Sequence, residues 1–313
     1  MRYSKKNLDN QYKEIAFYIK NNSANLIAKN AIQIFQSLEY SNNTAYNSMI
    51  SFLSEFPYWG KLDPQQNNYE YFIDKANTVK KNIEKIDWLY HNLKDLKSKT
   101  VLLGILKNWL FLDYNLLEKV RDHTAQYFDT NIFKTNSNQT FVDVGAYTGD
   151  TVESYITTYG IGYKKIICFE ILDSSLKLLK ENTKSYHDIF YIKEGCSNKI
   201  GRSHIQLNPF SRSSTKIGTG KQSISLTTLD HAIPEKIDFI KMDIEGGELK
   251  ALTGAQKHIQ KEKPHLAIAA YHTNADLYDI PLKIKRLNPQ YKIHLRYYGG
   301  LYIVPTEFVV LAH

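Results

Sequence analysis

The chain has 313 residues, a hydrophobic fraction of 42% and a formal net charge of +8, with a sequence pI near 9.1. This length suits one large domain or two smaller ones, and this apolar fraction predicts a packed core. The lysines are scattered along the sequence, which is typical of a solvated surface. Attraction to an anionic glycan, a nucleotide-linked substrate or an acidic membrane surface stays open.

Cysteine content and hydropathy exclude several classes of protein. The two cysteines, Cys168 and Cys196, fall in expected strand or strand-end positions. We therefore expect buried reduced thiols rather than a disulfide framework or a cysteine zinc site. Residues 1–10 have no apolar segment of the signal-peptide kind, and no apolar run approaches ~20 residues, so we expect no membrane span. The expected location is the cytoplasm.

Residues 1–134 are expected to form a helical domain. Apolar residues recur there at helical spacing, as in Ile83, Ile86, Tyr90 and Leu93 and again in Leu103, Leu106 and Leu110. We favour a packing or dimerisation role for this half, because aromatic residues at helical spacing are usually core. The alternative is a cap over the substrate, with Tyr58, Trp59 or Trp109 as sugar-stacking surfaces. A polar linker at residues 131–139 separates this half from a second domain at residues 135–313.

Residues 140–150 predict the first strand, glycine turn and helix of a doubly wound α/β sheet. Gly145 and Gly149 allow the backbone to approach a ligand closely. Asp143 and Asp150 place carboxylates where a dinucleotide fold would hold a pyrophosphate. Carboxylates are wrong for phosphate but suit a cationic or hydroxyl-rich cofactor such as S-adenosylmethionine (SAM). An ordinary turn after a parallel strand is the alternative.

The next strand, residues 165–170, ends on Glu170. An acidic side chain at this position can accept hydrogen bonds from both hydroxyls of an adenosine ribose. The alternative is a charge placed at the start of the following helix, for which Asp173 is the expected cap.

Residues 237–248 predict a buried strand that ends in three carboxylates, Asp243, Glu245 and Glu248. In a doubly wound sheet this strand neighbours the first one, so its end should lie beside the glycine loop. Clustered carboxylates are costly unless they hold a cation, a proton or a ligand. They could orient a substrate, bind a divalent metal such as Mg²⁺, or, in the case of Glu245 or Glu248, cap the following helix.

A strand at residues 264–272 ends on Tyr271 and His272. A neutral imidazole there could take a proton from an alcohol, with Asp243 as the rival base; a histidine that only hydrogen-bonds a loop is the alternative. We expect Pro281 in the first turn of the helix that follows. A link through Gly299 and Gly300 should make the last strand antiparallel to its neighbour.

Several of these segments resemble the FkbM-type SAM-dependent methyltransferases: residues 141–150, 239–249, 270–272, 280–281 and 294–297. Residues 87–90 and 126–129 look similar to the part that often precedes this domain. The resemblance implies a seven-stranded, mostly parallel, Rossmann-like class I methyltransferase sheet and methyl transfer to oxygen, often on a sugar or a polyketide. Tyr297 departs from the pattern, since members of this family commonly carry histidine there.

The resulting expectation is SAM-dependent O-methylation of a sugar hydroxyl in a surface glycan, such as capsule or lipopolysaccharide, or in a glycan precursor. The expected cofactor residues are Asp143, Gly145, Tyr147, Gly149, Asp150 and Glu170. The residues expected to face the acceptor are Asp243, Glu245 and His272. An obligatory metal is not expected, although the carboxylates leave it open. One alternative is methylation of RNA or protein, but the sequence has neither a basic stripe with interleaved aromatic residues nor an amino-methylating motif. The other alternative is a non-catalytic SAM-binding module.

Overall fold

The computed structural model describes residues 4–134, 137–206, 215–218, 220–300 and 304–313. The chain divides into two compact units. Unit 1 comprises Met1–Asp122, Ala270–Asp279 and Ile293–Val309, and unit 2 comprises His123–Ala269, Ile280–Lys292 and Val310–His313. The first unit therefore combines the helical half of the sequence with two segments from the last fifty residues or so of the chain. The domain boundary at residues 134 and 135 stays a prediction.

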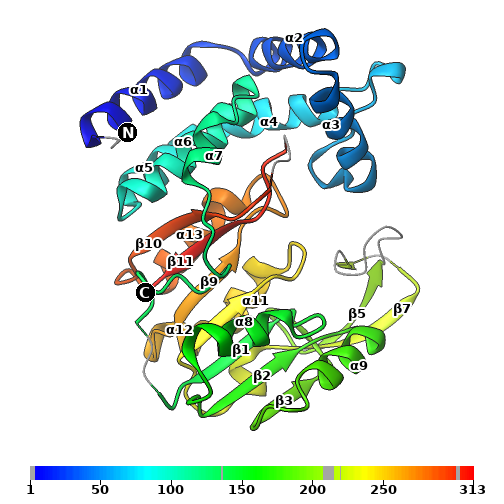
Figure 1. Cartoon of the computed structure of the whole chain (residues 1–313), viewed down its shortest axis with the longest axis vertical. Coiled ribbons are helices and arrows are strands. Elements are labelled where there is room, and N and C mark those ends of the chain that lie inside the picture. Colours follow the sequence, from blue (N-terminus) through cyan, green and yellow to red (C-terminus); the bar gives the residue numbers. More distant parts are fainter. Residues whose placement is uncertain (1–3, 135–136, 207–214, 219, 301–303) are drawn as a thin grey trace. The chain divides into compact units, whose positions relative to one another are not determined.

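Unit 1 is mainly helical, as predicted for this part of the sequence (Figure 1). Its α-helices are α1 (Lys5–Asn21), α2 (Ala24–Ser41), α3 (Asn43–Glu55), α4 (Glu70–Lys81), α5 (Ile83–Asn92), α6 (Leu96–Phe111) and α7 (Asn115–Val120), with 3₁₀ turns η1 (Pro57–Trp59) and η2 (Pro64–Gln66). Side-chain oxygens of Ser4, Ser23 and Asn42 cap the first three helices. Trp59 and Trp109 are buried, as expected of core residues, whereas Tyr58 is half-buried. The role of this half, packing layer or cap, stays a prediction.

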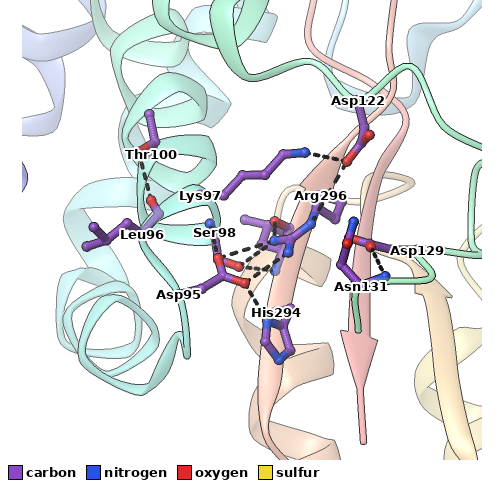
Figure 2. A network of polar contacts seen from close by, with 11 residues as sticks. Asp95, Leu96, Lys97, Ser98, Thr100, Asp122, Asp129, Asn131, His294 and Arg296 are labelled. Carbon is purple, nitrogen blue, oxygen red and sulfur yellow. Dashed lines mark hydrogen bonds and ion pairs between the residues drawn. The ribbon is translucent and has the colours of Figure 1, made fainter. Parts of the chain in front are cut away.

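A partly buried polar network joins the start of α6 to β10 (Ile293–Tyr297) within unit 1 (Figure 2). Asp95 caps α6, and its Oδ1 accepts a hydrogen bond from the Ser98 N–H at 2.7 Å. Its Oδ2 lies 2.6 Å from His294 Nδ1 and 2.9 Å from Arg296 Nη2. Burial raises the pKa of the Asp95 carboxyl, but hydrogen bonds from His294 and Arg296 outweigh burial and hold that pKa well below its usual range. The motif at residues 294–297 thus fastens a strand to a helix.

Among the described residues, a seven-stranded sheet has the order β10-β11-β9-β8-β1-β2-β3. Its remaining strands are β1 (Thr140–Val144), β2 (Lys165–Phe169), β3 (Ile189–Ile192), β8 (Phe239–Met242), β9 (His265–Ala269) and β11 (Phe308–Ala312). Strand β1 pairs in parallel with both β2 and β8, as Figure 1 shows for β1 and β2, and β8 pairs in parallel with β9. The predicted seven-stranded, mostly parallel sheet is confirmed.

The last two strands are antiparallel, as predicted. Lys292 and His313 exchange backbone hydrogen bonds of 2.8 and 3.2 Å, and the Tyr298 N–H donates to the Glu307 carbonyl at 3.0 Å. A second sheet with the order β4-β7-β5-β6 is made of β4 (Gly195–Cys196), β5 (Gly201–Gln206), β6 (Lys216–Gly218) and β7 (Gln222–Thr227).

The remaining helices of the described chain are α8 (Asp150–Tyr159), α9 (Asp173–Asn182), α10 (Leu229–Ala232), α11 (Glu248–Gly254), α12 (Gln256–Lys261) and α13 (Asp276–Leu287). Two predictions about them are wrong. Leu172, not Asp173, is the N-cap of α9, and Asp173 is its first helical residue. Pro281 lies inside α13 rather than in its first turn, because the helix already begins at Asp276.

Aromatic side chains form the core behind β1 in unit 2. Phe141 of β1 stacks on Tyr155 of α8 with ring centroids 4.3 Å apart, and Phe128 and Phe239 pack edge-on against Phe141. This packing fixes the strand whose carboxyl end carries the glycine loop. The two cysteines are free and buried, as predicted. No helix in the described parts of the chain is long and apolar enough to cross a membrane.

Candidate functional site

The loop after β1, residues 145–149, follows an uncommon backbone path. Gly145, Tyr147 and Gly149 all have positive φ, at 84°, 45° and 94°. For a non-glycine residue such as Tyr147 this conformation is sparsely populated, and such residues are frequent at ligand sites. The N–H groups of Gly145 and Ala146 both donate to the Phe169 carbonyl at 3.0 Å, which ties the loop to the end of β2.

Gly145 is required by a close backbone approach as well as by its φ. A Cβ atom placed there would lie 2.1 Å from the Asp243 carbonyl oxygen. The loops that follow β1 and β8 therefore touch through their backbones in unit 2, as the parallel pairing of these strands predicts. A side chain at residue 145 would push the two loops apart.

Glu170 holds the glycine loop and retains capacity for a ligand. Its Oε2 accepts a hydrogen bond from the Tyr147 N–H at 2.9 Å, and its Oε1 accepts from Ile171 and Leu172 at 2.8 Å each. Burial raises the pKa of this carboxyl, against the lowering effect of these three N–H groups. An ionised carboxylate has about four acceptor positions, so Oε2 can still accept one hydroxyl. The geometry thus fits one ribose hydroxyl of SAM and also fits the alternative role at the start of α9.

Asp143 is fully buried in β1 and forms an ion pair with Lys241 of β8, at 3.0 Å from Oδ1 to Nζ. The same Nζ donates to the Gly145 carbonyl at 2.8 Å. Burial raises the pKa of Asp143 to about 6 in spite of the Lys241 charge. For Lys241, burial acts to lower the pKa, but the carboxylates of Asp143 and Asp243 outweigh it and raise the pKa. Asp143 thus supports the glycine loop from behind, through Lys241.

The carboxylates after β8 have separate surroundings within unit 2. Asp243 Oδ2 accepts a hydrogen bond from the Tyr127 hydroxyl at 2.7 Å. Glu248 is buried and its Oε1 accepts from the Ile244 N–H at 2.9 Å, so Glu248 closes the turn before α11. Glu245 has φ 58° and, like Tyr147, lies in the left-handed region. Asp243 and Glu245 therefore stay candidates for contact with an acceptor. Glu248 has a structural bond within the turn, but no side-chain hydrogen bond in the described chain caps α11, so the predicted capping role is wrong for this bond.

Sequence reasoning missed two residues of this site. Lys241 could have been recognised as a lysine inside an otherwise apolar strand. A buried charge of this kind is costly unless it pairs with a carboxylate, here one in a neighbouring strand. Tyr127 lies in the segment 126–129, which resembles the part that often precedes the family domain, but nothing in the sequence linked it to Asp243.

His272 belongs to unit 1, three positions after the end of β9. Its side chain is 2% exposed, and its ring lies 4.4 Å from that of Tyr271, centroid to centroid. The turn that follows is capped by Asp276, whose carboxylate accepts from the Thr273 N–H at 2.6 Å and from the Thr273 hydroxyl at 2.8 Å. The role of His272 as a base stays a prediction.

Residues 143–291 match the family model of the methyltransferase FkbM domain. The predicted resemblance is confirmed for this segment, which holds every residue predicted for the cofactor and the acceptor. No curated protein matched in a separate comparison.

A solved structure of an FkbM methyltransferase shows the same fold. The methyltransferase FkbM from Methylobacillus flagellatus KT matches with a TM-score of 0.66 and 26% identity, over 79% of this chain and 63% of that one. The present chain therefore spans less than two thirds of that protein. An rRNA methylase from Streptococcus thermophilus matches with a TM-score of 0.39 and 15% identity, over 57% of this chain and 87% of that one. Both the family model and the FkbM structure thus show that the chain is similar to the methyltransferase FkbM domain.

Proposed function

We propose that this protein transfers the methyl group of SAM to a hydroxyl of a sugar in a surface glycan or a glycan precursor. The observation that carries the proposal is the strained glycine loop beside Glu170, inside a segment that matches the FkbM domain. The sugar class rests on the family resemblance, and the net charge of +8 is compatible with an anionic glycan or a nucleotide-linked sugar.

In this proposal the loop 145–149 and Glu170 hold the cofactor. Gly145, Tyr147 and Gly149 shape the loop, Glu170 accepts a ribose hydroxyl, and Asp150 is exposed at the start of α8. Bound SAM supplies a sulfonium methyl that is already a reactive electrophile. The chain's own contribution is therefore to orient the hydroxyl in line with that methyl and to remove its proton.

The acceptor is assigned to Asp243, Glu245 and His272. Asp243, oriented by the Tyr127 hydroxyl, and Glu245 would hydrogen-bond the sugar hydroxyls. His272 would take the proton, because a neutral imidazole is suited to general-base work near neutral pH. Asp243 is the rival base, although an ionised aspartate has a low proton affinity unless burial raises it.

Incubation of the full chain with isotope-labelled SAM and fractionated cell glycans, followed by mass spectrometry, tests this function. We expect label on a glycan fraction and none on RNA or protein supplied in parallel. Label on RNA or protein would show that the acceptor is that macromolecule and not a sugar. SAM binding in a calorimeter without transfer to any fraction would favour the non-catalytic alternative.

A further inference from the structure

The loop that carries His272 is fastened on both sides by side chains from the helices of unit 1. Just before His272, the Tyr271 carbonyl accepts a hydrogen bond from Trp59 Nε1 at 2.6 Å. Just after it, Asn274 Oδ1 accepts from Lys75 Nζ at 2.6 Å. Residues 271–274 are thus held at two points, one on either side of His272.

Lys75 is an unexpected residue in the core of a helical unit. It lies in α4, is 3% exposed and has its Nζ 4.0 Å from the ring centroid of Trp109, 5.3 Å from that of Tyr71 and 6.0 Å from that of Trp59. Burial lowers the pKa of its amino group well below the usual value. Burying an amino group is costly, and an apolar side chain of similar size would serve packing at least as well. A role beyond packing is therefore needed to account for a lysine here.

We propose that Lys75 is a positioning residue for His272: it fixes Asn274, while its neighbour Trp59 fixes Tyr271. This inference rests on the proposed function, in which His272 takes the proton of the acceptor hydroxyl. Proton transfer needs the base within hydrogen-bond reach of that hydroxyl, and displacement by about 1 Å can cost about 10²-fold in rate. The hydrogen bonds from Trp59 and Lys75 hold the chain on either side of His272. They thereby fix the position of the His272 Cα atom, from which the imidazole side chain extends.

The first test replaces Lys75 by methionine, which fills similar space among aromatic rings but cannot donate to Asn274. We expect an unchanged or higher Tm, because a buried amino group is removed, and an unchanged affinity for SAM. We expect kcat to fall by about 10- to 10²-fold with a much smaller change in the acceptor KM. A purely structural lysine would leave kcat as in the parent.

Lys85→Met is the matched control. Lys85, in α5 of the same unit, has its Nζ 2.8 Å from Asp279 Oδ1, in α13, and has no bond to residues 271–274. This variant loses a lysine and an ion pair but leaves the anchors of the loop in place. We expect parental kcat.

Hydrogen exchange gives a readout that does not depend on activity. Peptides covering residues 271–276 should exchange about tenfold faster in Lys75→Met and in Asn274→Ala than in the parent, and peptides covering residues 145–149 should not change. The double variant should exchange and turn over no worse than either single one, because both changes remove the same bond. Asn274→Ala also covers the case in which Lys75→Met does not fold.

Exchange and kcat within about twofold of the parent in Asn274→Ala would overturn the inference. A parent that binds SAM but transfers no methyl group would instead overturn the proposed function, while the exchange data would still show whether Lys75 anchors the loop.

Discussion

Two loops carry the candidate chemistry, and they are held in different ways. In unit 2, groups at the end of β2 hold the loop 145–149. The N–H groups of Gly145 and Ala146 donate to the Phe169 carbonyl, and that of Tyr147 donates to the Glu170 carboxylate. In unit 1, side chains hold the loop 271–274, and the bonding partners are 212 and 199 positions apart in the sequence. The first loop is part of a local strand–turn–helix unit, whereas the second depends on the helical segment. Binding of SAM and loss of the acceptor proton should therefore respond to different substitutions.

The largest effect is expected for His272→Ala. If His272 is the base, kcat falls by about 10²–10⁴-fold, while SAM affinity and Tm stay as in the parent. Steady-state kinetics and calorimetry on the same preparation measure both quantities. Turnover within a few-fold of the parent would exclude this role, and an equal loss in Asp243→Asn would transfer it to Asp243.

The next effect concerns the support behind the first loop. Lys241→Met leaves Asp143 fully buried without its charged partner, so we expect the free energy of unfolding to fall by about 3–5 kcal/mol at neutral pH. The loss should shrink in acid, because protonation of Asp143 removes the unpaired charge. Urea unfolding at several pH values measures this. The double variant Asp143→Asn/Lys241→Met is the control and should recover most of the stability.

A smaller effect, on the cofactor side alone, is expected for Glu170→Ala. Loss of one charge-assisted hydrogen bond to a ribose hydroxyl costs roughly 1.5–3 kcal/mol, which is about 10- to 150-fold in SAM affinity. Calorimetry measures the affinity. Tm should fall as well, since three N–H groups lose their acceptor. An unchanged SAM affinity would remove Glu170 from the cofactor site, and a kcat at saturating SAM that stays near the parental value would support the separation of the two loops.

The pH dependence of unit 1 gives a weaker test of how its distant segments are joined. The pKa of Asp95 is held below its usual value in the folded chain, so its contribution to stability is complete above about pH 4 and is lost as the pH falls further. The difference in unfolding free energy between the parent and Asp95→Asn should therefore narrow below about pH 4. A constant difference down to pH 2 would show that the network around Arg296 does not depend on this charge.

No change is expected on removal of divalent metal. In the proposed function Asp243 and Glu245 bind the acceptor directly, so dialysis against EDTA should leave the rate of methyl transfer as it was. Loss of activity with EDTA and its recovery with Mg²⁺ would assign these carboxylates to a metal instead.

Sequence alone predicted the features that depend on short stretches. The apolar run before Gly145, the acidic residue that ends β2 and the buried strand before Asp243 each carry their signal within about ten residues. Their arrangement in a parallel sheet follows from general rules of topology. The mostly parallel sheet and the contact between the two loops of unit 2 were therefore within reach, whereas the number of strands, seven, was implied by the family resemblance.

The features that were missed depend on residues brought together from distant positions. Tyr127 and Asp243 are 116 positions apart, and Lys75 and Asn274 are 199 apart, so neither pair leaves a periodic or local pattern. The partner of Tyr297 could not be predicted from the sequence either. Tyr297 departs from the family pattern, and its hydroxyl contacts the hydroxyl of Tyr114, which comes from a distant part of the chain. Such partners are set by packing, which sequence spacing does not reveal.

The composite make-up of unit 1 has a consequence for the way the protein is made. A ribosome synthesises Lys75 well before Asn274, and at ~5–20 residues per second the 199 positions between them take roughly 10 to 40 s. During this interval the helices exist without the strand and the loop that complete their core. The apolar surface of the nascent helices therefore stays exposed to solvent during this interval. These helices are candidates for chaperone binding until the last part of the chain has been synthesised.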